Sequence, residues 1–184
     1  MNSILLISAY LAAVNPARTR LGVPEEVNGR ARMALLGGGT VIGVSVLTGI
    51  AAASRPLLDA LDISPETFRI AAGFVLVIVA AWMIFVPVPD EEPVPVGAAA
   101  AVWPIAFPRV ISPETITLAL STGASDGLGL TVAGLAVANA VLLGLGWVRA
   151  GPTSGRGLAS IGRVLAVVLV LVGVWLAIQG VREI

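Results

Sequence analysis

Long apolar runs alternate with short polar stretches along this chain, and the lengths of the runs predict six membrane-spanning helices. A helix needs about 20 consecutive, mainly apolar residues to cross the hydrocarbon core of a bilayer. The predicted spans cover residues 3–23, 33–53, 67–86, 96–120, 128–148 and 161–181. The expected fold class is therefore all-α: a polytopic membrane protein with six transmembrane helices.

Proline interrupts the first and the fourth predicted spans. A proline inside a helix removes a backbone donor and clashes with the preceding turn. If residues 96–120 formed one helix, it would measure about 37 Å against a hydrocarbon core of about 30 Å. We therefore expect helices 1 and 4 to be broken, with the second half of helix 4 starting at Pro113. The interrupting residues are Pro16 in the first span and Pro104, Pro108 and Pro113 in the fourth.

The tetrapeptide SPET occurs twice, at residues 64–67 and 112–115, and each copy has the composition of a helix start. Ser is a good N-cap, Pro fits the first helical position, and Glu is favourable in the first turn. The first copy opens the third span. The second copy lies inside the fourth span, where a helix N-terminus offers free N–H groups and partial positive charge to a carboxylate. We hypothesise a substrate site that includes Ser112, Pro113, Glu114 and Thr115; the alternative is a kinked helix without a ligand.

Two charged residues lie within the fourth span, Arg109 near its middle and Glu114 just after the expected break. Charged side chains at this depth are costly, usually face the protein interior, and mark substrate or ion paths. On a continuous helix these two residues lie on different faces, but across a break they can meet. Three alternatives follow: Arg109 binds an anionic group, Glu114 takes up a coupling proton, or the two form a structural ion pair that locks the break.

Polar residues in the first and fifth spans extend the predicted site. Asn15 precedes Pro16 and offers donors and acceptors to backbone groups that the proline frees. Arg18 and Arg20 lie near the expected cytoplasmic end of the span, where they either snorkel to the interface or line an anion path. Asn139 makes an interhelical hydrogen bond or contacts substrate. The candidate substrate-binding residues therefore also include Asn15, Pro16, Arg109 and Asn139.

The composition agrees with a membrane protein and excludes several kinds of chemistry. The chain is 57% hydrophobic and only 12% charged, whereas an average soluble domain is about 25% charged. It contains no Cys and no His, which excludes thiol chemistry, disulfides, the usual zinc and haem ligand sets, and an imidazole base. We expect no cofactor and no metal site. The sequence also lacks an HExxH motif and paired intramembrane Asp residues, so an intramembrane enzyme is disfavoured.

A Pro- and acid-rich linker at residues 87–95 divides the chain into two three-helix repeats, at residues 1–86 and 96–184. The last spans of the two halves resemble each other, since each begins near an Arg, continues with Val, Leu and Ile, and has a Trp near its end. An odd number of spans per half gives the repeats opposite orientations. Inverted repeats with broken helices at matching positions are typical of transporters. The alternative is a chance resemblance between two apolar spans.

The distribution of basic residues predicts the orientation in the membrane, because cytoplasmic loops carry an excess of Lys and Arg. All eleven basic residues are Arg, and most lie at the ends of the spans that join the first to the second and the fifth to the sixth. Both termini should then face outward, and the linker should be cytoplasmic. The cytoplasmic group is Arg18, Arg20, Arg30, Arg32, Arg149, Arg156 and Arg163, and the outer group is Arg55, Arg69 and Arg182.

Four stretches resemble, in their order, the MarC family of bacterial integral membrane proteins, within the LysE-type exporter superfamily. They are NP at 15–16, FRIAAGFVLVIVAAWMIF at 68–85, PIAFP at 104–108 and SPETIT at 112–117. The resemblance covers essentially the whole chain. It implies six spans in two inverted repeats, both termini outside, and transport of small neutral amino acids such as glycine and alanine. By position, it also implies a central site lined by Asn15, Pro16, Pro108, Ser112 and Pro113.

Charged residues near both breaks depart from the family pattern. Arg18 and Arg20 follow the NP pair, where the family usually continues with small apolar residues. Arg109 and Glu114 flank the second break, where the family is usually uncharged. These differences suggest a more charged substrate or a different coupling ion.

These predictions indicate a secondary transporter, an exporter or exchanger of amino acids or similar small metabolites, in the bacterial plasma (inner) membrane. We expect alternating access around a midplane site between broken helices 1 and 4, with half-helix N-termini holding the substrate carboxylate and Glu114 as the ion-coupling residue. The expected partners are an amino acid-like or carboxylate small molecule and the lipid bilayer, with no nucleic acid, and a homo-oligomer is left open. The alternative function is a non-transporting membrane scaffold or accessory subunit.

Overall fold

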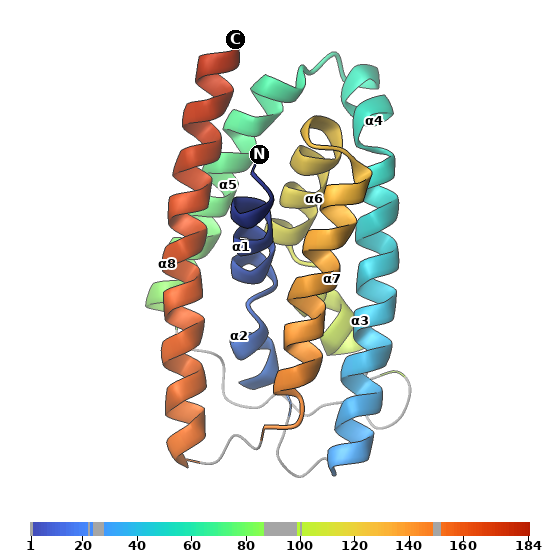
Figure 1. The fold of residues 1–184 in the computed structure, drawn as a ribbon, viewed down its shortest axis with the longest axis vertical. Coiled ribbons are helices and arrows are strands. Elements are labelled where there is room, and N and C mark those ends of the chain that lie inside the picture. Colours follow the sequence, from blue (N-terminus) through green and yellow to red (C-terminus); the bar gives the residue numbers. More distant parts are fainter. Residues whose placement is uncertain (1, 22, 24–27, 87–98, 100, 149–151) are drawn as a thin grey trace.

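The computed structural model describes residues 2–21, 23, 28–86, 99, 101–148 and 152–184, and within these ranges the chain forms helices and turns but no strand (Figure 1). This confirms the expected all-α class. The elements are α1 (Ser3–Val14), α2 (Pro16–Leu21), α3 (Gly29–Ala52), α4 (Ser54–Ala60), α5 (Pro65–Phe85), the irregular element η1 (Ala101–Val110), α6 (Pro113–Ser125), α7 (Leu128–Leu145) and α8 (Pro152–Glu183).

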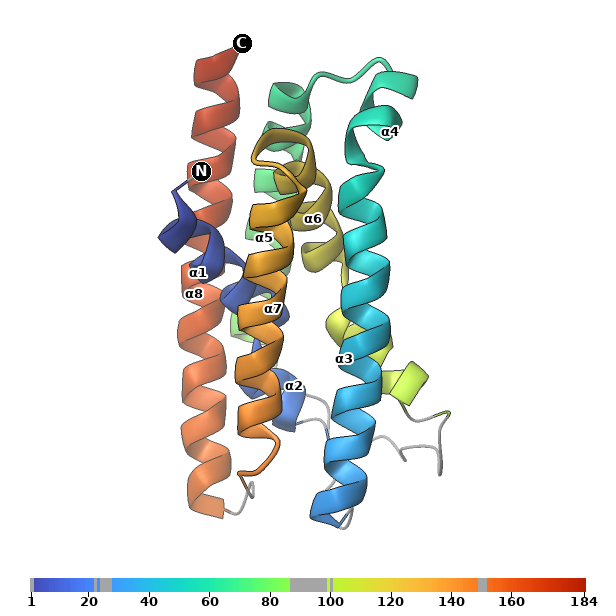
Figure 2. The ribbon, with the colours of Figure 1, turned by 45° about the vertical axis from the view of Figure 1, so that its right-hand side comes forward.

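Successive elements run up and down the long axis of the molecule. In the view of Figure 1, α1 and α2 descend, α3 ascends, α5 descends, η1 and α6 ascend, α7 descends, and α8 ascends. The C-terminus and α4 lie at the upper end, and α2 and the starts of α3 and α8 lie at the lower end (Figures 1 and 2).

Four helices in the described part of the chain are long and apolar enough to cross a membrane, namely α3, α5, α7 and α8. The first and fourth predicted spans are each divided into shorter pieces. Of these, α1 has 12 residues and α6 has 13 residues, whereas a complete crossing needs about 20. The divided spans lie among the long helices, because α1 packs against α7 and α8, and α6 packs against α3 and α5.

Several boundaries differ from the hydropathy prediction. Helix α8 begins at Pro152 rather than at residue 161. Hydropathy detects only the apolar part of a helix, whereas the polar first turns begin at a proline, which fits the first helical position. The short helix α4 was not predicted, and it connects α3 to the turn before α5. The predicted linker at residues 87–95 lies outside the described residues.

The distribution of side chains is that of a membrane protein, with large apolar side chains exposed and a set of polar side chains buried within an apolar core. Large apolar side chains are exposed along α3, α5, α7 and α8, which in water would form an unfavourable apolar surface. Polar side chains are buried between the helices instead. The buried polar residues outside α2 and α3 are Asn15, Ser54, Ser112, Glu114, Thr115, Ser121, Thr122, Thr131 and Asn139.

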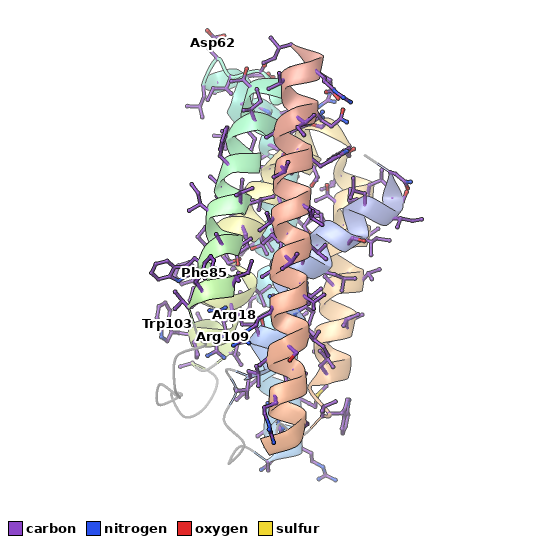
Figure 3. The ribbon with its side chains drawn as sticks, turned by 90° about the vertical axis from the view of Figure 1, so that its left-hand side faces the viewer. Arg18, Asp62, Phe85, Trp103 and Arg109 are labelled. Carbon is purple, nitrogen blue, oxygen red and sulfur yellow. The ribbon has the colours of Figure 1, made fainter. Side chains whose placement is uncertain are left out.

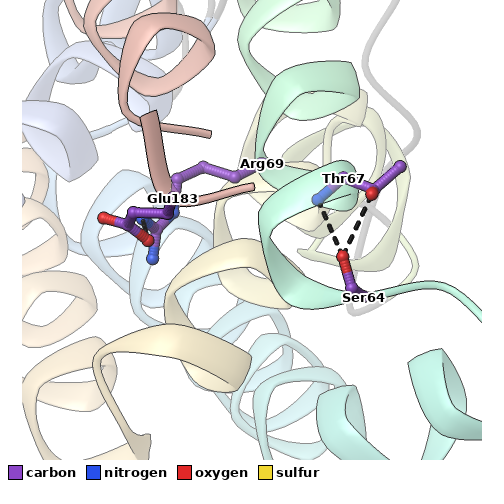
Figure 4. Close-up of polar contacts among 4 residues, drawn as sticks. All are labelled: Ser64, Thr67, Arg69 and Glu183. Atoms are coloured by element: carbon purple, nitrogen blue, oxygen red, sulfur yellow. Dashed lines mark hydrogen bonds and ion pairs between the residues drawn. The ribbon is translucent and has the colours of Figure 1, made fainter. Parts of the chain in front are cut away.

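Helices α5 and α8, which end the two predicted repeats, pack closely and antiparallel. A Cβ atom on Gly73 would lie 2.4 Å from the Gly173 carbonyl oxygen, so the backbones meet where neither residue has a side chain. At one end of the pair, Arg69 near the start of α5 forms an ion pair with Glu183 at the end of α8 (Figure 4). The same figure shows the first SPET copy capping α5, where the Thr67 N–H donates to the Ser64 hydroxyl at 3.2 Å.

Candidate functional site

The first predicted break lies between α1 and α2, at Asn15. This residue has φ 42°, in the left-handed region that Asn tolerates better than most non-glycine residues. Its side-chain amide donates to the Gly162 carbonyl of α8 at 2.9 Å, and its Oδ1 atom accepts from the Arg18 N–H at 3.2 Å. Asn15 therefore caps α2 and ties the break to α8, which agrees with its predicted role of bonding backbone groups near Pro16.

The second predicted break lies between η1 and α6. Within η1, Trp103 and Phe107 have extended backbone angles, and each precedes a proline. Helix α6 then begins at Pro113, as predicted, with Ser112 as its N-cap. The Ser112 and Thr115 side chains and backbones form a reciprocal capping box, in which the Ser112 N–H donates to the Thr115 hydroxyl at 2.9 Å.

A threonine satisfies a freed carbonyl at each break in the same way. The Thr19 hydroxyl donates to the Val14 carbonyl at 3.0 Å, and the Thr115 hydroxyl donates to the Val110 carbonyl at 2.7 Å. In both cases the acceptor lies five residues earlier, at the end of the element that precedes the break. At each interruption, a carbonyl freed by the break is thus paired, as an apolar surrounding requires.

The N-terminus of α6 is occupied by its own side chains. The Thr115 N–H donates to the Ser112 hydroxyl at 3.4 Å, and the Glu114 carboxylate interacts with its own backbone N–H and with the Ser112 hydroxyl. Glu114 is buried, with 4% of its surface exposed. The Thr115 N–H is therefore capped within the helix, and binding of a substrate carboxylate at this terminus stays a prediction.

Arg18 connects the first broken element to both α5 and the second broken element. Its guanidinium donates to the Met83 carbonyl at 2.8 Å and to the Val86 carbonyl at 3.4 Å, and so satisfies carbonyl groups at the C-terminal end of α5. The same cation interacts electrostatically with Glu114. Arg18 is thus a charged residue between the two broken elements that we did not include among the predicted site residues.

Arg109, the partner that the sequence suggested for Glu114, lies at the end of η1 and is half-buried. Figure 3 shows Arg18 and Arg109 at similar heights, below the middle of the molecule, and shows Asp62 at its upper end. The Arg109 side chain also has an interaction partner.

Arg20 corrects the interpretation that this side chain snorkels to the membrane interface. It has 0% of its surface exposed. Its guanidinium donates to the Val148 carbonyl at 2.7 and 3.0 Å and to the Val23 carbonyl at 3.2 Å. The carbonyl groups that follow the end of α7 lack helical partners, and the planar guanidinium, with five donors, supplies them.

Asn139 does not make the interhelical hydrogen bond expected of it. Its side-chain amide donates to the Leu135 carbonyl, one turn earlier in α7, at 2.9 Å. Its Oδ1 atom is buried and has no hydrogen-bond partner among the described residues. The hydroxyl oxygen of Thr40, in α3, is also buried and has no hydrogen-bond partner among the described residues. We did not predict a role for Thr40, although a polar residue among the small residues of an uncharged span is a recognisable signal.

A second polar cluster, also not predicted, lies between α1, α6 and α7. The Tyr10 hydroxyl and the Thr122 hydroxyl are 2.8 Å apart, and the Thr131 hydroxyl donates to Thr122 at 3.0 Å. All three side chains are buried. The cluster fills the interior toward the end of α6 opposite to Glu114, so buried polar groups occur near both ends of this helix.

Comparison with known proteins gives one positive result. A family model described as "MarC family integral membrane protein" matches residues 19–184. No curated protein and no solved structure matches the chain.

Proposed function

The chain belongs to the MarC family of integral membrane proteins, and we propose that it is a secondary transporter, an exporter or exchanger of amino acids or similar small metabolites. It is a multi-pass membrane protein whose apolar helices enclose several buried polar residues. In the proposed mechanism, alternating access takes place around a site between the α1–α2 break and the η1–α6 break. Glu114 would bind and release the coupling proton there.

The observation that carries this proposal is the meeting of the two broken elements. Helix α1 packs against α6, and α2 contacts η1. Glu114 is buried in the first turn of α6, and Arg18 lies in α2. Ionisable side chains in a membrane interior are expensive and usually functional. Arg18 and Glu114 each lie within a few residues of a helix break. A small change of backbone angle at a break can move one half of a broken helix relative to the other.

Several features support the two inverted repeats that belong to this proposal. Each half contains one broken element, and each break has a threonine that donates to a valine carbonyl five residues earlier. The last helices of the halves, α5 and α8, run antiparallel and meet at Gly73 and Gly173. Two copies of a repeat related by a twofold axis in the membrane plane would place equivalent helices in this way.

The proposed location is the bacterial plasma (inner) membrane with both termini outside. The lower end of the molecule carries Arg18, Arg20 and the arginines at the starts of α3 and α8, whereas the upper end carries fewer. The positive-inside rule would make the lower end cytoplasmic.

The test is exchange in proteoliposomes that contain the purified protein. Vesicles are loaded in turn with neutral, acidic and basic amino acids and with simple carboxylates, and uptake of the labelled compound is measured. Saturable exchange of one class supports the proposal. If folded protein exchanges no member of the panel, a non-transporting scaffold or accessory subunit becomes the better account.

A further inference from the structure

Three buried side-chain oxygens have no hydrogen-bond partner among the described residues: Oγ of Ser125, at the end of α6, and, further inside the bundle, Oδ1 of Asn139 and Oγ1 of Thr40. Asn139 and Thr40 are 2% and 7% exposed. Buried polar atoms in folded proteins are nearly always hydrogen-bonded, and each exception calls for an explanation. In a transporter, one explanation is that the partner is the substrate.

The chemistry of the unpaired atoms is set by the bonds that their residues already make. The Asn139 amide nitrogen must be the atom that faces Leu135, because a backbone carbonyl can only accept a hydrogen bond. The unpaired atom is therefore the carbonyl oxygen of the side chain, which is an acceptor. The Thr40 hydroxyl can donate or accept. Together they offer acceptors to a group that carries N–H or O–H.

Contacts along α7 place Asn139 near the level of the first break. Gly134 lies against Tyr10 of α1, and α1 and α7 descend in the same direction in Figure 1. Asn139 follows Gly134 by as many residues as Asn15 follows Tyr10. The helical rise of about 1.5 Å per residue therefore puts both asparagines about 7 Å below this contact.

Contacts along α3 place Thr40 near the level of the second break. Its neighbours Gly39 and Gly43 lie against Ile105 and Val110 of η1, close enough that a Cβ atom on either glycine would clash. Val110 is the last residue before the break. At the lower end, Leu36 of α3 meets Gly146 of α7, and this register puts Thr40 and Asn139 within about one helical turn of the same height.

We propose that Asn139 and Thr40 are specificity-determining residues that bind a hydrogen-bond donor of the substrate. An ammonium group fits this pair best, because the buried carboxylate of Glu114 lies on α6, which packs against both α3 and α7. A simple carboxylate has no donor to offer. The inference rests on the proposed transport function and assigns these residues to selection between amine-bearing substrates and plain anions.

The test uses three small carboxylates that differ in one substituent: L-alanine carries an ammonium group, L-lactate a hydroxyl, and propionate neither. Affinity is measured by ligand-induced thermal stabilisation of the purified protein in detergent and by competition with labelled L-alanine in proteoliposomes. In the wild type we expect the order alanine, lactate, propionate. Asn139→Leu should reduce the preference for alanine over propionate about tenfold, since one buried hydrogen bond is lost.

Thr40→Val is the second variant, which keeps the inference testable if Asn139→Leu does not fold. Valine keeps the shape of the threonine side chain. Its control is Thr48→Val, which removes a half-buried hydroxyl two turns further along α3 and should leave the preference unchanged. An unchanged alanine-to-propionate ratio in folded Asn139→Leu and Thr40→Val would overturn the inference but leave transport intact. Wild-type protein that neither binds nor exchanges any of the three compounds would count against the transport function itself.

Discussion

Replacing Thr115 by Val tests whether hydrogen bonds across the break before α6 stabilise the protein. Valine has the same shape as threonine but no hydroxyl. The Thr115 hydroxyl donates to the Val110 carbonyl at 2.7 Å and accepts from the Ser112 N–H at 2.9 Å, and the residue is fully buried. The substitution therefore leaves one buried carbonyl and one buried N–H without partners.

The expected loss of stability follows from these two groups. An unsatisfied buried backbone group costs about 1–3 kcal/mol, and the added methyl group of valine recovers part of this. We expect the unfolding free energy of Thr115→Val to fall by about 2–4 kcal/mol. Thr67→Val is the matched control in the first SPET copy, where the hydroxyl lies on the surface near Ser64. Water can replace it, and the expected change is about 0.5 kcal/mol or less.

The assay is reversible unfolding in mixed micelles, with increasing SDS and with helicity followed by circular dichroism. Thr19→Val should also destabilise the protein, by about 1–3 kcal/mol, because one carbonyl, that of Val14, loses its donor. If Thr115→Val costs no more than Thr67→Val, the hydrogen bonds across the break do not stabilise it, and our explanation of the broken helix is wrong.

Three further substitutions test other parts of the fold. Gly73→Ala should lower the unfolding free energy by about 1–3 kcal/mol, because the new Cβ atom meets the backbone of α8. Gly49→Ala is the control and should not lower it, because nothing lies within 4 Å of the added Cβ atom. Equal effects of the two substitutions would refute the close approach of α5 and α8. Arg20→Met should lower the melting temperature, because buried carbonyls lose their donors, and an unchanged temperature would favour snorkelling after all. Arg69→Gln should change the unfolding free energy by at most about 1 kcal/mol, because its partner Glu183 is half exposed, and a larger loss would show that this ion pair holds α5 to α8.

The positions of the breaks could be predicted because proline acts locally. Pro16 and Pro113 cannot continue a helix, and the residues before them, Asn15 and Ser112, are good caps, so the letters alone locate both interruptions. The start of α5 at the first SPET copy follows in the same way. Membrane insertion could be predicted because it depends on composition over about 20 residues.

The partners of the charged side chains could not be predicted, because they depend on which helices become neighbours. Arg18 and Arg20 lie at the end of a span, where snorkelling is the common role, but α2 is surrounded by the ends of α5 and α7, whose carbonyls need donors. Arg18 and Glu114, from the two halves of the chain, likewise come within range of each other's charge only in the fold. The sequence suggested Arg109 because it lies in the same predicted span as Glu114, on the other side of the break.

The most direct test of the proposed function compares two glutamates in identical tetrapeptides. Glu114→Gln changes the buried carboxylate between the two breaks, and Glu66→Gln changes its counterpart in the first SPET copy, at the start of α5. In proteoliposomes with an imposed pH gradient, we predict that Glu114→Gln loses proton-driven accumulation but retains exchange of labelled substrate, while Glu66→Gln behaves as the wild type. Proton-driven accumulation that survives in folded Glu114→Gln would contradict the account.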